Sequence, residues 1–246
     1  MNIKFKMPKF GRKMNGGSMA KELLLTTLAT SISIVLTFGT AMWLEHQQKE
    51  KNRRQTALMV ISDIYVFQCD LQMYYEYFMK WKADIEELKS LSPDSILRLT
   101  DEDIERFAVA VEAPMSFTRD KTAENIFTSD ISTWRDVGNY QFIRLVGHSY
   151  SLIADIEKNF KAKMDERGIN NKNFETNFDT ENMSEAEQLI AYMKQKEMKR
   201  CIDDFCNGFC PYINNSIDEV KQYVEACMEL MSISNDELNE FIANSQ

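Results

Sequence analysis

LLLTTLATSISIVLTFGTAMWL, from Leu23 to Leu44, is a run of 22 residues without a charged side chain. As an α-helix it is about 33 Å long at roughly 1.5 Å per residue, enough to cross the hydrocarbon core of a bilayer. The run therefore predicts a transmembrane helix. It divides the chain into a tail (residues 1–22), a membrane segment (residues 23–44) and a larger outer domain (residues 45–246).

Charge on the two sides of this run predicts its orientation. Residues 1–22 contain six basic residues and one glutamate, whereas residues 45–54 contain four basic residues and two glutamates. Because cytoplasmic flanks are richer in Lys and Arg, the N-terminus is expected in the cytoplasm and the outer domain across the membrane. The basic tail either sets the topology alone or also lies on anionic lipid.

A cleaved signal peptide is the alternative interpretation of residues 1–41. Gly39-Thr40-Ala41 places small residues at a spacing suited to cleavage after Ala41. However, the apolar run exceeds the roughly 7–15 residues of a signal-peptide core, and the basic region before it is long. We therefore expect the segment to be retained as an anchor.

Small residues recur along one side of the expected membrane helix. They lie four positions apart, at Ala29, Ser33, Thr37 and Ala41. Such a stripe lets a second helix approach closely, although Ser and Thr are also tolerated in lipid without a partner. Self-association, a membrane partner and a helix packed only by lipid are all compatible with it.

The segment that follows predicts one long, packed helix. No Gly or Pro occurs between Thr40 and Ser92. Ten apolar residues are spaced alternately three and four positions apart: Ala57, Val60, Ile64, Phe67, Leu71, Tyr74, Phe78, Trp81, Ile85 and Leu88. This period is typical of a helix that packs in coiled-coil fashion, here within a bundle and continuous with the membrane helix.

The rest of the chain predicts further helices, so the expected fold class is all-α. Only 8 Gly and 4 Pro occur, which disfavours a turn-rich β fold. Thr100 and Asn139 are expected helix caps, with Pro114 and Gly168 as stops. Capping boxes at Ser184, Ser216 and Ser234 predict helices near 185–207, 217–231 and 235–243, after a polar loop at 170–182.

Two stretches carry a resemblance to a known family. The first runs from Glu22 to Ile64 and includes Gly39, Ala41, Trp43, Glu45 and Lys49–Arg53; the second runs from Thr122 through Trp134 and Asn139 to Ile143. They resemble an uncharacterised bacterial family of single-pass membrane proteins with an N-terminal anchor. The resemblance implies a topology and a helical outer domain, and it transfers no catalytic residue. It covers a minority of the chain, and the C-terminal third lies outside it.

Charge and motifs argue against several classes of function. The chain has a net charge of −9, and the acidic excess falls in the outer domain, which would repel nucleic acid phosphates. His148 precedes Ser149, but the glycine pattern of a hydrolase elbow is lacking. No EF-hand, phosphate-binding or dinucleotide-binding motif occurs in the sequence. We expect no catalytic activity, no metal and no cofactor.

Cysteines and aromatic residues supply the remaining candidate sites. Three of the cysteines lack the spacing of a zinc site: Cys201, Cys206 and Cys210. Two alternatives are open for them, namely one disulfide between two of the three in an exported domain, or buried, inert thiols. Cys69 and Cys227 are expected in the core. The aromatic residues between Tyr65 and Trp81 are expected to lie in the core. Tyr75 and Tyr77 lie outside the row of ten apolar residues, which we call the seam, and they are candidates for a ligand pocket or a partner surface.

Together these features predict a membrane-anchored helical interaction or scaffold protein in a bacterial inner membrane, with a periplasmic outer domain. Its expected partners are the lipid bilayer and other proteins or copies of itself. The alternative is a sensory domain that binds a small molecule in the aromatic region and signals through the continuous helix.

Overall fold

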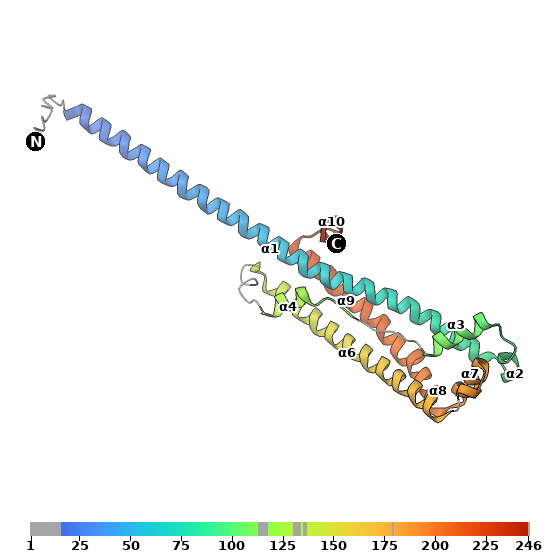
Figure 1. The fold of residues 1–246 in the computed structure, drawn as a ribbon. Coiled ribbons are helices and arrows are strands. Elements are labelled where there is room, and N and C mark those ends of the chain that lie inside the picture. Colours follow the sequence, from blue (N-terminus) through green and yellow to red (C-terminus); the bar gives the residue numbers. More distant parts are fainter. Residues whose placement is uncertain (1–15, 113–117, 130–133, 135–136, 179, 246) are drawn as a thin grey trace, which may run out of the picture. The chain divides into compact units, whose positions relative to one another are not determined.

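The computed structural model describes residues 16–112, 118–129, 134, 137–178 and 180–245 (Figure 1). Most of the expected basic tail (residues 1–15) and the expected stop at Pro114 lie outside these ranges. The described regular structure is helical and contains no strand, which confirms the all-α fold class. The chain divides into two compact units, Met1–Asn52 and Arg53–Gln246.

The first unit contains the N-terminal part of helix α1, which spans Gly16–Ser90. This part is long and apolar enough to cross a membrane, and none of its apolar window is buried. The side chains of Ile34, Leu36 and Phe38 are each at least half exposed. The hydroxyl of Thr37 donates to the Ser33 carbonyl at 2.7 Å, so it needs no second helix for its hydrogen bond. Both features suit a helix surrounded by hydrocarbon.

The second unit begins with the rest of α1, and the predicted seam is its buried face. Nine of the ten seam residues are buried, and Tyr74 is half-buried. Leu58 and Ile61, which lie beside that row, are buried as well. The sequence prediction of one long helix packed within a bundle is therefore confirmed.

The other elements of the second unit follow α1 in the chain. α6 and α9 lie side by side along the bundle (Figure 1). The elements after α1 are α2 (Pro93–Ile96), α3 (Asp101–Glu112), α4 (Thr122–Ser129), α6 (Tyr140–Asn177), η1 (Thr180–Asn182), α7 (Glu185–Lys194), α8 (Lys196–Asp204), the π-helical turn η2 (Phe205–Phe209), α9 (Cys210–Met231) and α10 (Asn235–Ser245).

Four of the predicted helix starts are confirmed by their caps, and one of them is at Ser234, whose hydroxyl accepts from the Glu237 amide at 3.3 Å. The Thr100 hydroxyl accepts from the Asp103 amide at 3.2 Å, and the Asn139 side chain accepts from the Phe142 amide at 3.1 Å. Ser184 and Glu187 form a full capping box. These bonds satisfy amides that a helix N-terminus would otherwise leave without partners.

The predicted loop at 170–182 is wrong over most of its length, because α6 continues past Gly168 to Asn177. Phe174 is buried, and its ring lies 4.8 Å from that of Phe178 and 5.2 Å from that of Tyr192. The Tyr192 hydroxyl donates to Asn171 Oδ1 at 2.5 Å. Contacts with the rest of the bundle thus outweigh the weak local helix preference of this Asn-rich stretch.

The predicted boundaries at 207 and 217 are also wrong. The chain breaks at Gln195 and is then helical from Lys196 to Met231. Ser216 is no cap: it is buried inside α9, and its hydroxyl donates to the Tyr212 carbonyl. Pro211 lies in the first turn of α9, directly after the π-helical turn η2. Burial of Phe205 and Phe209 favours the continuous path.

Candidate functional site

The aromatic residues of α1 form packed core. The Phe78 ring lies 5.3–5.8 Å from four other rings, those of Trp81, Phe160, Phe205 and Phe209. All five side chains are buried. This confirms the core interpretation of the aromatic region, and it removes the geometric basis for a ligand among these rings.

Tyr75 and Tyr77, the two candidate ligand residues, have different surroundings. Tyr75 is half-buried and packs against the core, whereas Tyr77 is 49 % exposed. Tyr77 shares one side of α1 with Val66 and Met73, which are 41 % and 45 % exposed. Because these positions are seven and four apart on a helix, they lie along one line. We call Val66, Cys69, Met73 and Tyr77 the outer face of α1.

The cysteines are free thiols in the structure, and no disulfide joins Cys201, Cys206 or Cys210. All three are buried, as expected for the alternative of buried thiols. Burial raises the pKa of Cys210 and of Cys227 to about 12, so neither is a thiolate nucleophile at neutral pH. Cys227 is in the core as predicted, but Cys69 is exposed, so its assignment to the core was wrong.

A buried ionic network around Arg119 was missed by the sequence analysis. Its guanidinium side chain is 6 % exposed and contacts Asp63 of α1 and Glu157 of α6, each at 3.1 Å, and Glu124 of α4. The Tyr150 hydroxyl donates to the same Asp63 carboxylate at 2.9 Å. Burial raises the pKa of Asp63 despite the neighbouring cation. The network joins three helices, which is a structural role.

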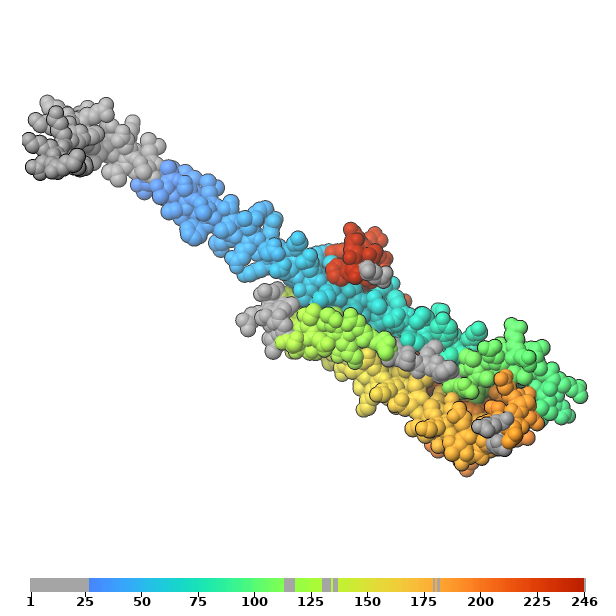
Figure 2. Space-filling view, viewed as in Figure 1, coloured from blue at the N-terminus to red at the C-terminus, as the bar shows by residue number. Residues whose placement is uncertain are grey.

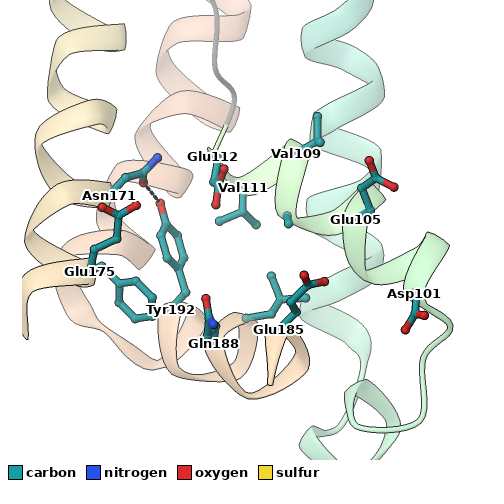
Figure 3. Close-up of a pocket in the computed structure, with 13 residues that line it drawn as sticks. Asp101, Glu105, Val109, Val111, Glu112, Asn171, Glu175, Glu185, Gln188 and Tyr192 are labelled. Carbon is teal, nitrogen blue, oxygen red and sulfur yellow. Dashed lines mark hydrogen bonds between the residues drawn. The ribbon is translucent and has the colours of Figure 1, made fainter. Parts of the chain in front are cut away.

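A pocket of about 510 Å³ lies between α3, α6 and α7. In the space-filling view α3 (green) and α7 (orange) lie next to each other (Figure 2). Figure 3 shows α6 on one side of the cavity, α3 on the other and α7 across its base. Its volume falls within the range of roughly 300–1,000 Å³ typical of small-molecule sites. Neither Tyr75 nor Tyr77 lines it.

Arg167 of α6 holds the two longer walls of this pocket together. Its side chain is buried, and Nη2 donates to the Val111 carbonyl at 2.5 Å and to the Ala110 carbonyl at 3.2 Å. The guanidinium also lies 4.3 Å from the centre of the Phe205 ring. These carbonyls belong to the last turn of α3, which a cation stabilises. Burial lowers the pKa of Arg167 from its ordinary value.

The pocket combines an apolar floor with an acidic rim. Its floor contains both aliphatic and aromatic side chains: Ala108, Val109, Val111, Phe174, Leu189 and Tyr192. Its rim carries five carboxylates: Asp101, Glu105, Glu112, Glu175 and Glu185. None of the five forms an ion pair with another residue in the described ranges, and the described residues that line the pocket include no Lys, Arg or His. The pKa of Glu112 is raised by burial and by the charge of Glu175.

The described residues contain no group of three or more His, Cys, Asp or Glu side chains arranged to hold a metal ion. His148 is exposed on α6. Comparison of the chain with family models, with curated proteins and with solved structures gave no match in any of the three.

Proposed function

We propose that this chain is a single-pass membrane protein whose helical outer domain binds protein partners or copies of itself, without catalytic activity. The observation that carries the proposal is the bare apolar part of α1, which has the length and composition to span a bilayer. The charge on its two sides favours a cytoplasmic N-terminus and, in a bacterium, a periplasmic outer domain in the inner membrane.

The outer face of α1 supports the interaction role. Val66, Met73 and Tyr77 expose apolar surface along one side of α1 within the helical domain. Aromatic and Met side chains of this kind are enriched in protein interfaces. The small-residue stripe of Ala29, Ser33, Thr37 and Ala41 offers a second contact surface within the bilayer.

Cys69 makes this proposal testable, because the other four cysteines are buried. We expect a short bis-maleimide cross-linker, applied to membranes that contain the full chain, to yield a covalent dimer through Cys69. The Cys69→Ser variant should give none. Met73→Lys, which places a charge on the outer face, should lower the dimer yield about tenfold.

Met79→Lys is the matched control for that experiment. Met79 is a similarly exposed methionine of α1 but lies off the outer face. Its replacement should leave the dimer yield unchanged. A monomer in every sample, or equal yields from the two lysine variants, would argue against self-association through this face.

A sensory role is the second candidate, and the pocket between α3, α6 and α7 favours it. The site would then be this pocket rather than Tyr75 and Tyr77. A signal from this pocket would then pass along α1 to a partner in or across the membrane.

A further inference from the structure

We propose that the pocket between α3, α6 and α7 binds a small organic ammonium ion with an apolar body. This inference concerns binding at one site of the outer domain and holds whether or not the chain self-associates. It rests on three properties of the pocket, namely its volume, its floor and its rim.

The floor can hold an apolar body. Phe174 and Tyr192 present their rings from α6 and α7, and their centroids lie 5.2 Å apart at 68°. Leu189 and Val111 add aliphatic surface. Apolar side chains of this kind, in a cavity of about 510 Å³, suit a ligand with a ring or a branched alkyl chain. Aromatic faces also attract cations, so the floor itself favours an ammonium group over a neutral one.

The rim determines the sign of the ligand charge. Five carboxylates surround the opening, and no Lys, Arg or His is among the lining side chains that the structure describes. The single guanidinium of Arg167 is buried behind Val111, so the net charge around the opening is negative. Burial raises the pKa of Glu112, and repulsion by the charge of Glu175 adds to this rise. A cation placed between them would relieve that repulsion, whereas an anion would add to it. Anionic ligands such as phosphates and carboxylates are thus disfavoured.

The test uses the full chain in uncharged detergent micelles and two probes that differ in charge. We expect 2-phenylethylammonium to bind saturably in isothermal titration calorimetry. The neutral analogue 2-phenylethanol should bind about tenfold more weakly, because it lacks the interaction with the rim. Equal affinity for both probes, or no saturable heat for the ammonium probe, would overturn the proposal.

Two double variants test whether the ammonium probe binds in this pocket. Replacing both Glu112 and Glu175 by Gln should weaken binding of the ammonium probe about tenfold. The matched control replaces Glu219 and Glu240 by Gln; it removes the same charge from exposed positions outside the pocket and should change nothing. Equal affinities in the two double variants would contradict the assignment.

A pocket-filling variant keeps the test valid if the carboxylate double variant does not fold. Val109 lines the pocket and is 41 % exposed, so Val109→Trp should fill the cavity without disturbing the core. It should abolish binding while its thermal unfolding matches that of the unmodified chain. Retained binding in a folded Val109→Trp protein would place the probe elsewhere and overturn the proposal.

Discussion

Arg119→Ala should destabilise the helical domain by about 4 kcal/mol, since it leaves a set of partly buried carboxylates without their shared cation. Arg119 contacts Asp63, Glu124 and Glu157, which come from three different helices. Without these contacts no shared cation would link Glu124 of α4 to Asp63 of α1 and Glu157 of α6. The loss should be measured as the free energy of unfolding in urea, followed by tryptophan fluorescence of the full chain in detergent.

Arg98→Ala is the matched control, because Arg98 is exposed and forms no ion pair among the described residues. It should change the unfolding free energy by less than about 0.5 kcal/mol. Equal unfolding midpoints for the two variants would show that the network contributes nothing.

The loss of unfolding free energy in Arg119→Ala should depend on pH. Burial already raises the pKa of Asp63, and removing Arg119 should raise it further. A carboxyl whose pKa is raised by folding contributes stability below its unfolded pKa and loses that contribution as pH rises through the folded value. The deficit in the unfolding free energy of Arg119→Ala should therefore narrow as pH falls through the folded pKa of Asp63, which lies above its unfolded value of about 4.

Phe78→Ala should cost about 4 kcal/mol, because it opens a cavity at the centre of the aromatic core. Phe78 is fully buried and contacts rings on α1, α6 and η2. The bundle would recover little of this space by relaxing, since the surrounding rings are large and already packed. Urea unfolding by circular dichroism measures the effect.

The neighbouring Tyr77 provides the control for that substitution. Tyr77→Ala removes an aromatic side chain of similar size from an exposed position on the same helical turn. It should change stability by less than about 0.5 kcal/mol. If the two variants unfold at the same urea concentration, the central role of Phe78 in the core is wrong.

The fold was largely predictable because its signals are local and periodic. The seam from Ala57 to Leu88 repeats every three or four residues, and that spacing alone identifies the buried face of a helix. The caps at Thr100, Asn139 and Ser184 act within one helical turn, so they too can be recognised in the sequence.

The errors arose where distant contacts outweigh local preference. Gly168 is compatible with a helix stop, but Phe174 is buried against Tyr192 of the next helix and keeps α6 helical to Asn177. Likewise Ser216 matches a capping box but lies inside α9. Nothing within one helical turn of either residue reveals those packing partners.

The pocket and the Arg119 network could not be predicted because each assembles separated segments. The pocket takes its walls from residues 101–112, 171–175 and 185–192. Two of its acidic residues, Asp101 and Glu185, lie in the first turns of α3 and α7, where the helix dipole already favours a negative charge. In the sequence they therefore give no sign of a shared site. Only the positions of the three helices show that five carboxylates share one opening.

The central claim, an anchor formed by residues 23–44, is tested most directly by alkaline carbonate extraction of membranes from cells that produce the full chain. A helix that spans the bilayer resists this treatment and is released only by detergent. The account predicts that the chain stays in the membrane pellet after carbonate and moves to the supernatant after detergent. Release of the chain by carbonate alone would contradict it.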